Sequence, residues 1–144
     1  MAEGDILFFN SFKTDLVNNN VDWTVDTIKL MLVNSYSPNY DTEEFKSAVD
    51  GASTEISGSG YTVGGETLGG KSVTKDNTND QADVAANDVT WTSLASNTIT
   101  YGVLYKDTGN AATSNLIATV EIATNSNGAN YTVGWNSGVV FTLT

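Results

Sequence analysis

Several residue types that support protein chemistry are missing from this 144-residue chain. It contains no cysteine and no histidine. Without cysteine, disulfides and thiolate metal sites are excluded, and without histidine the chain lacks the commonest general base and metal ligand. Ser-His-Asp, Cys-His and zinc chemistry are therefore excluded. Arginine is absent too, since all six basic residues are lysine, so the chain lacks the planar group that binds phosphate or carboxylate through paired hydrogen bonds.

Positive charge is scarce as well. The chain has 6 lysines and 17 acidic residues, which gives a formal net charge of −11 at pH 7. This charge repels nucleic acid and anionic membrane surfaces at long range, so we expect neither as a partner. Long apolar runs are also missing, because the acidic start, residues 1–5, leads into only Ile6–Phe9. We therefore expect no signal peptide, no membrane span and a soluble product of the cytoplasm.

Serine, threonine and asparagine make up about a third of the residues, and proline occurs once. This composition is typical of strands with one solvated face, joined by turns that side chains stabilise. The length suits a single domain, residues 1–144, whose core needs no covalent cross-links. Within it, we interpret residues 1–20 as an N-terminal helix or anchor segment.

Two segments have helical spacing. In residues 8–17, five apolar side chains recur at helical intervals, and the asparagines at 18–20 would end this helix. These five are Phe8, Phe9, Phe12, Leu16 and Val17. In residues 43–49, Phe45 and Val49 stand four apart, which predicts a short helix pinned to the body of the protein.

The rest of the chain alternates short apolar segments with turn residues, which predicts strands. The most apolar segment spans residues 26–33. The other strands are expected near 61–74, 82–91, 97–105, 115–123, 130–135 and 138–143. The last two flank a glycine-containing turn, a spacing typical of a hairpin. Short strands without long helices predict a mainly β fold, an antiparallel β-sandwich or jelly-roll-like barrel with a short N-terminal helix.

The two sheets of such a fold would share one core, drawn from the inward positions of the strands. The expected core residues are Ile28, Leu30, Leu32, Val89, Trp91, Ile99, Val103, Tyr105, Ile117, Val120, Ile122, Val133, Trp135, Val139 and Phe141. Trp23 lies in a predicted loop, where we expect it to be exposed or to pack on the N-terminal helix. Together with Tyr36 and Tyr40 it is a candidate exposed aromatic, and a groove of the three would suit a sugar ring.

Gly65–Ser72 matches the phosphate-loop pattern G-x-x-x-x-G-K-[ST]. Such a loop works when a buried strand leads into it and a helix follows, aiming its N–H groups at phosphate. Here residues 56–64 are rich in glycine, and residues 73–80 are β-branched and turn-forming. We therefore interpret the match as coincidental and the segment as a glycine-rich bend between two strands, and we expect no cofactor.

Carboxylates are plentiful, and a facing pair could hydrolyse glycosides. The available groups are Asp22 with Asp26, Asp41 with Glu43 and Glu44, and Asp76 with Asp80. Most stand in polar, turn-like contexts where a carboxylate caps backbone N–H groups, so we assign no catalytic residue. The segment Asp76–Asp80 leaves calcium binding open, but it lacks the frame of an EF-hand and we assign no metal site.

Five segments together resemble a known class of proteins. They are FNSFKTDLVNNNVDWTVDTIKLMLVNSYSPNYDTEEF near the start, GSGYTVGGETLGGKSVTKDNTND in the middle, and DVTW, YGVLYKDTG and TVGWNSGVVFTLT towards the end. In order and spacing they are similar to a family of bacteriophage virion structural proteins, which are small β-rich components of phage heads and tails. The resemblance covers nearly the full length of the chain.

This resemblance implies a capsid decoration or cement protein, made in the host cytoplasm, that binds the outside of the shell of major capsid protein in the virion and stabilises it. It also implies a homo-oligomer, commonly a trimer. An apolar N-terminal segment is costly to leave in water unless it packs on its own body or on a neighbour. The candidate contacts with the capsid or a neighbouring copy are therefore Ile6, Leu7, Phe8, Phe9 and Phe12.

Two other functions stay open. A tail or fibre component would bind host-surface carbohydrate through exposed aromatic side chains. An acid–base enzyme such as a glycosidase would need two carboxylates facing each other across a cleft.

Overall fold

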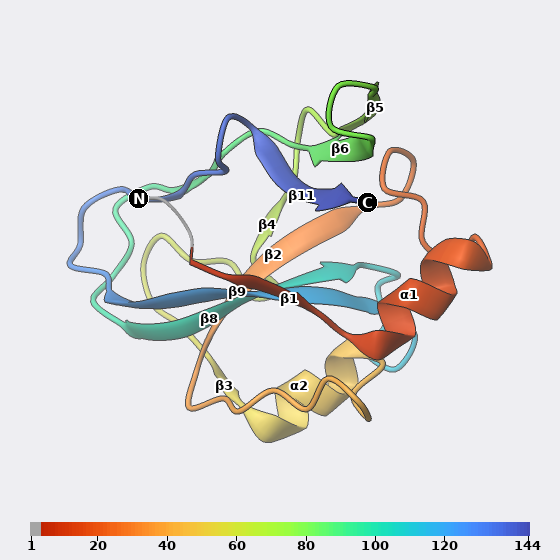
Figure 1. Ribbon diagram of the computed structural model, residues 1–144. Coiled ribbons are helices and arrows are strands. Elements are labelled where there is room, and N and C mark those ends of the chain that lie inside the picture. The colour runs from red at the N-terminus through yellow and green to blue at the C-terminus, as the bar shows by residue number, and fades with distance from the viewer. Residues whose placement is uncertain (1–3) are drawn as a thin grey trace.

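The computed structural model describes residues 4–144, which form two short helices and eleven strands (Figure 1). The helices are α1 (Asn10–Val17) and α2 (Lys46–Ala52). The strands are β1 (Ile6–Phe8), β2 (Ile28–Asn34), β3 (Thr54–Glu55), β4 (Glu66–Thr67), β5 (Ser72–Asp76), β6 (Gln81–Ala85), β7 (Val89–Trp91), β8 (Thr98–Lys106), β9 (Leu116–Asn125), β10 (Tyr131–Val133) and β11 (Val139–Leu143). All strand pairs are antiparallel, which confirms the mainly β fold class with a short N-terminal helix.

A six-stranded sheet forms the centre of the molecule. Its strand order is β1-β9-β8-β2-β3, and β4 also pairs with β2. The strands β2, β8 and β9 are apolar at most positions because both faces of the sheet are covered. The prediction of a strongly apolar core strand near residues 26–33 is confirmed, since β2 lies between β8 and β3 and is buried along most of its length.

Two smaller sheets cover one face of this central sheet. One consists of β11, β6 and β5 in that order, and the other of β10 and β7. In Figure 1 the strands β5, β6 and β11 lie above the central sheet. Buried side chains from all three sheets pack together here in what we call the first core. They include Ile28, Leu30, Leu32, Val84, Val89, Trp91, Ile99, Leu104, Ile117, Val133, Trp135 and Phe141.

The opposite face of the central sheet is covered by α2 and by the irregular segment 35–45, which lie below the sheet in Figure 1. The buried residues of this second core are Phe9, Met31, Val33, Tyr36, Val49, Val103, Tyr105 and Leu116. The prediction of a single core that includes Val103 and Tyr105 is therefore wrong. These two side chains are buried, but they point to the face covered by α2, because β8 alternates between two apolar surroundings.

The N-terminal segment is partly strand and partly helix. A single helix was predicted over residues 8–17, but the chain first forms β1, paired with β9, and the helix begins only at Asn10. Three residues are too few to show the alternation of a strand, so β1 could not be predicted from the sequence. The predicted asparagine stop is confirmed, since Asn19 has a left-handed φ of 59°. Residues 1–3 of the predicted segment 1–20 lie outside the described residues.

The second predicted helix is shifted along the chain. Residues 43–49 were expected to be helical, whereas α2 begins three residues later and continues to Ala52. Phe45 is extended and forms an isolated bridge with Asn115, so it precedes the helix. Val49 is fully buried in the second core, and it pins α2 to the central sheet as predicted.

Three strand predictions need correction. Residues 61–74 are no single strand, because β4 and β5 are separate and join different sheets. Residues 82–91 hold two strands, β6 and β7, again in different sheets. The predicted hairpin of the last two strands is wrong, since β10 pairs with β7 and β11 pairs with β6. A bulge between Val139 and Phe141 leaves Val139 only half-buried, although we expected it in the core.

Candidate functional site

Four aromatic side chains meet where α1 approaches β11. The ring of Phe141 lies 4.9 Å from that of Phe8, 5.9 Å from Phe12 and 5.4 Å from Trp23, measured between centroids. All three contacts are edge-to-face, with interplanar angles of 78–85°. The indole N–H of Trp23 donates to the carbonyl oxygen of Ala85 at 3.0 Å, which fixes this ring against β6.

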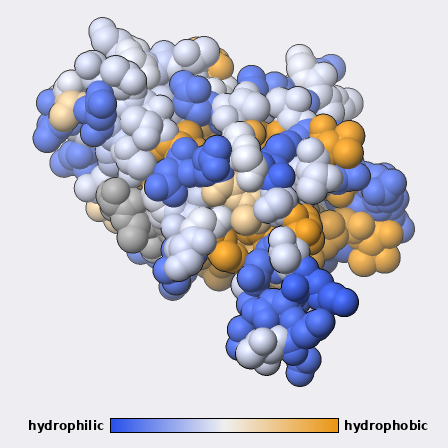
Figure 2. Space-filling model, turned by 90° about the horizontal axis from the view of Figure 1, so that it is seen from above, coloured by the Kyte–Doolittle hydropathy of each residue, from blue (hydrophilic) through white to orange (hydrophobic). Residues whose placement is uncertain are grey.

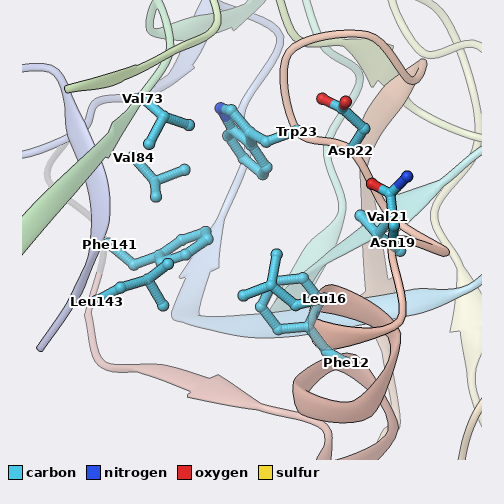
Figure 3. A pocket seen from close by; sticks show the side chains of 10 residues that line it. All are labelled: Phe12, Leu16, Asn19, Val21, Asp22, Trp23, Val73, Val84, Phe141 and Leu143. Atoms are coloured by element: carbon cyan, nitrogen blue, oxygen red, sulfur yellow. The ribbon is translucent and has the colours of Figure 1, made fainter. Parts of the chain in front are cut away.

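Beside this cluster the surface is hollowed. The hollow has a volume of about 230 Å³ and opens to solvent between α1, the loop that follows it and the three-stranded sheet (Figure 3). Its lining is mainly apolar and consists of Phe12, Leu16, Asn19, Val21, Asp22, Trp23, Val73, Val84, Phe141 and Leu143. In Figure 3 the side chains from β5, β6 and β11 face Phe12 and Leu16 of α1 across the space.

Asp22 is the one charged residue in this lining. Its carboxylate accepts hydrogen bonds from the backbone N–H groups of Thr24 and Val25, at 3.0 and 3.2 Å, and from the Thr24 hydroxyl at 2.9 Å. The Thr24 hydroxyl and then the Val25 N–H hold the pKa of Asp22 below its ordinary value. The group therefore stays negatively charged at neutral pH, at the edge of an apolar surface.

Two lysines hold the loop that carries Asp22. The ammonium group of Lys71 donates to the carbonyl oxygen of Asp26, and that of Lys106 donates to the carbonyl oxygen of Asn20 at 2.7 Å. Lys106 also forms an ion pair with the Asp26 carboxylate at 3.2 Å. Burial lowers the pKa of Lys71. Both lysines are thus used to hold the loop, and neither is among the residues that line the hollow.

The predicted contact residues of the N-terminal segment are divided between the inside and the surface. Phe9 and Phe12 are buried, and Ile6 and Phe8 are half-buried against the first core. Leu7 remains 52% exposed. The segment therefore packs mainly on its own body, the alternative that the sequence left open, and of these five contact residues only Leu7 presents a large apolar surface to solvent.

The prediction of exposed aromatic side chains is wrong. Trp23 and Tyr36 are each only 5% exposed, and Tyr40 is half-buried. Trp23 belongs to the first core, whereas Tyr36 and Tyr40 pack in or against the second core on the other face of the central sheet. The sequence could not show this, because each ring is covered by residues far away along the chain. These three residues therefore form no sugar-stacking groove.

Tyr36 and Tyr40 also make specific polar contacts. The Tyr36 hydroxyl donates to the Glu43 carboxylate at 2.5 Å, and the Asn39 N–H donates to the same oxygen at 3.2 Å. Burial, followed by the hydrogen bond to Glu43, raises the pKa of Tyr36. The hydroxyls of Tyr40 and Thr119 are 2.7 Å apart. The two bonds to Glu43 hold segment 35–45 in its own conformation, and the Tyr40–Thr119 contact ties it to β9.

The phosphate-loop pattern folds as the short strand β4, a bend and the first residue of β5. Ser72 begins β5, so no helix follows Lys71 to direct N–H groups at a phosphate. Gly65 has φ +81°, and a Cβ there would lie 1.9 Å from the Leu30 carbonyl oxygen. Gly70 has φ +61°, and a Cβ there would lie 2.4 Å from the Asn87 side chain. Gly65 is thus required by close packing against the backbone and Gly70 by its positive φ, and the expected glycine-rich bend is found only around Gly70, between β4 and β5.

The remaining carboxylates serve mainly as caps and bridges. Asp76 accepts from the N–H groups of Thr78 and Asn79, at 2.9 and 3.2 Å, and from the Asn79 side chain at 2.7 Å. Asp26 accepts from the Asp22 N–H at 2.7 Å, and Asp41 accepts from Asn10 at 2.8 Å. Residues 4–144 contain no group of three or more acidic side chains placed to hold a metal ion.

Some apolar side chains in the lining of the hollow, or close to its lining residues along the chain, are exposed. Val73, which lines it, is 49% exposed, and Val17 next to Leu16 is 86% exposed. Val25, in the turn capped by Asp22, is 78% exposed. The face seen in Figure 2 accordingly shows hydrophobic areas between hydrophilic ones. The sequence analysis missed this site, because its lining comes from positions 12 to 143 and only the fold brings them together.

No family model, curated protein or solved structure matches this chain. The resemblance to phage virion proteins therefore stays a prediction. Neither α1 nor α2 is long and apolar enough to cross a membrane.

Proposed function

We propose that this chain is a non-catalytic structural protein of a phage virion, a capsid decoration or cement protein that binds the outside of the major capsid protein shell and stabilises it. The observation that carries the proposal is the chemistry of the hollow. It is an open apolar depression with a single carboxylate, and some apolar side chains in its lining or close to its lining residues along the chain are exposed. Such a surface suits docking onto another protein, because covering it removes apolar area from water.

The architecture supports the same role. We propose that the central sheet and the two smaller sheets form a β-sandwich around the first core, with α2 as an additional layer. A sandwich of short antiparallel strands gives a rigid body without cofactors or disulfides. Its strong negative charge favours solubility and disfavours association with packaged DNA.

The proposed oligomer is a trimer, which rests on the resemblance to phage proteins. The second candidate, a tail or fibre component that binds host-surface carbohydrate, is not favoured. It depended on a groove of exposed aromatic side chains, and Trp23 and Tyr36 are buried.

Co-sedimentation with capsid shells assembled without this protein tests the proposal. We expect saturable binding to the shells and a higher melting temperature of the shells once they are decorated. Imaging of complete particles gives the matching location, which should be the outer surface of the head. Shells that neither bind the protein nor gain stability, or particles that carry it only on the tail, would contradict the proposal.

A further inference from the structure

The hollow offers room for one side chain of a partner. Its volume is about 230 Å³. An apolar cavity of about 150 Å³ takes up benzene, so a leucine or phenylalanine side chain can enter this larger space. The lining already holds Trp23 and Phe141 in edge-to-face contact, and an added ring would continue this packing.

The surroundings of the hollow have the layout of a protein anchor site. Val73 lines it, Val17 directly follows the lining residue Leu16, and Val25 donates its N–H to the lining residue Asp22; all three side chains are exposed. In protein interfaces a central anchor side chain fills a pocket, and surrounding contacts exclude water from it. Where a partner also covers these valines, they exclude water in the same way, and a folded protein surface covers more of this area than a small molecule does.

Charge decides which partner is favoured. Asp22 is the only charged residue in the lining, and its pKa is held low by the Thr24 hydroxyl and the Val25 N–H. The chain as a whole carries a formal charge of −11. A second copy would bring the same negative charge, and like charges oppose association. A segment that carries positive charge beside its apolar side chain is complementary to this edge.

We infer that the hollow receives one large apolar side chain, flanked by lysine or arginine, from the shell protein. This inference rests on the proposed function, because it identifies the shell protein as the partner. The apolar side chain fills the space beside Trp23 and Phe141, and the neighbouring cation lies next to Asp22. Val73 on β5 forms the accessible wall of the site.

Short peptides test the chemistry without any shell. Acetyl-Lys-Phe-Lys-amide and acetyl-Glu-Phe-Glu-amide are titrated into the full chain while the methyl signals of Leu16, Val73, Val84 and Leu143 are followed by NMR. The lysine peptide should move these signals and bind about five- to tenfold more tightly than the glutamate peptide. Replacing Asp22 by asparagine should reduce this preference. Equal affinities, or shifts confined to other methyl groups, would overturn the inference.

Shell binding tests the partner with a matched pair of variants. Val73→Asp places a charge in the wall of the hollow, whereas Val63→Asp changes the same residue type at a position that is 78% exposed and outside the lining. The first should weaken co-sedimentation with shells by about tenfold or more. The second should change it by less than about twofold. Val73→Phe, which fills the hollow without adding charge, should also weaken binding, and it shows that the loss does not depend on the new carboxylate.

The outcomes separate this inference from the proposed function. A thermal melt first checks that Val73→Asp is folded. If the folded variant then binds shells as the wild type does, the inference is overturned and the proposed function stands. If the wild type does not bind shells, both are overturned. Binding to zwitterionic lipid vesicles in place of shells would also overturn the inference, because the occupant would then be an acyl chain.

Discussion

The two faces of the central sheet are covered in different ways. We call the face that carries the second core the packed face. It is covered by α2 and segment 35–45, and tyrosine side chains form hydrogen bonds there. Tyr36 donates to Glu43 at 2.5 Å, and Tyr105 donates to the Gly64 carbonyl oxygen at 2.7 Å. We call the face that carries the first core the open face. It is covered by the two smaller sheets, which leave the hollow of about 230 Å³ beside α1.

This difference shows which kinds of element can cover an apolar face of a sheet completely. A loop and a helix can follow the sheet closely when their polar groups find partners inside, since an unpaired buried group is costly. The three-stranded sheet β11-β6-β5 does not close fully against α1, so the hollow remains open between this sheet and the side chains of Phe12 and Leu16. Both faces stabilise the fold through their buried side chains, and the open face in addition presents the hollow to a partner.

The largest loss of stability is expected when a side chain is added at Gly65, beside the packed face. Gly65 lies next to Gly64, the acceptor of Tyr105, and a Cβ there would collide with the Leu30 carbonyl oxygen. Gly65→Ala should lower the free energy of unfolding by more than about 3 kcal/mol, as measured by denaturant unfolding. Gly109→Ala is the control, because Gly109 also has positive φ but no atom within 4 Å of an added Cβ. It should cost only about 1 kcal/mol.

A pair of phenylalanine truncations compares the two faces directly. Phe9 is fully buried on the packed face, and its ring lies 5.3 Å from that of Tyr40. Phe9→Ala should cost about 3–5 kcal/mol in chemical denaturation. Phe141→Ala, on the open face, should cost at least about 1 kcal/mol less, because the hollow already admits water beside the ring. Equal losses for Phe9 and Phe141 would mean that the open face is as well packed as the other.

The hydrogen bond between Tyr36 and Glu43 provides a pH-dependent test of the packed face. Tyr36→Phe should cost about 1–3 kcal/mol at pH 7, since it leaves the Glu43 carboxylate with fewer donors. Burial and Glu43 raise the pKa of Tyr36 in the folded protein, so its contribution is complete below the unfolded pKa of about 10 and is lost as the pH rises through the folded pKa.

Thermal melts of the wild type and Tyr36→Phe from pH 8 upward measure this contribution. The wild type should lose stability more steeply above about pH 10, because the variant has one tyrosine fewer to ionise. Parallel curves would show that Tyr36 is ionised as easily in the folded as in the unfolded chain.

The smallest effect is expected from an ion pair at the border of the packed face. Lys29 and Asp107 are 2.9 Å apart, and both side chains are about a quarter exposed. Asp107→Asn should therefore cost at most about 1 kcal/mol at pH 7. The Gly109 N–H and then Lys29 lower the pKa of Asp107, so its contribution is present above the unfolded pKa of about 3.9 and is lost as the pH falls through the folded pKa.

Thermal melts at pH 7 and in acid check this sign. The difference between the wild type and Asp107→Asn should shrink as the pH falls below about 4. Asp26→Asn, which breaks the Lys106 pair, should cost a similar amount, since Asp26 and Asp107 each accept one backbone N–H, from Asp22 at 2.7 Å and from Gly109 at 2.9 Å. A difference for Asp107 that persists unchanged in acid would contradict the pairing.

Local patterns predicted a good part of this fold. The strand around Leu30 was predictable because its apolar run needs no information from elsewhere in the chain. The stop of α1 was predictable because asparagine tolerates the left-handed conformation that Asn19 adopts. The same holds for the bend around Gly70, since the residues that flank Gly65–Ser72 lacked the pattern of a phosphate site.

Partner choice was not predictable in the same way. A turn at Ser137 favoured pairing of the last two strands, yet β10 and β11 pair with β7 and β6 of different sheets. Trp23 lies in a loop as expected, and of the two alternatives left open for it, exposure is wrong, since Ala85 accepts its N–H and Phe141 packs on its ring. Both errors have one cause, which is that the deciding contacts join residues about 40 to 120 positions apart.

The sequence by itself determined the strand-rich class, the negative charge and the exclusion of cysteine and histidine chemistry, because these follow from composition and short-range periodicity. The tertiary structure decided which faces are closed and where the hollow lies. Its walls come from residues as distant as Phe12 and Leu143, and no local pattern records that these side chains meet. They do so because burying apolar area stabilises whichever distant segments the sheets bring together.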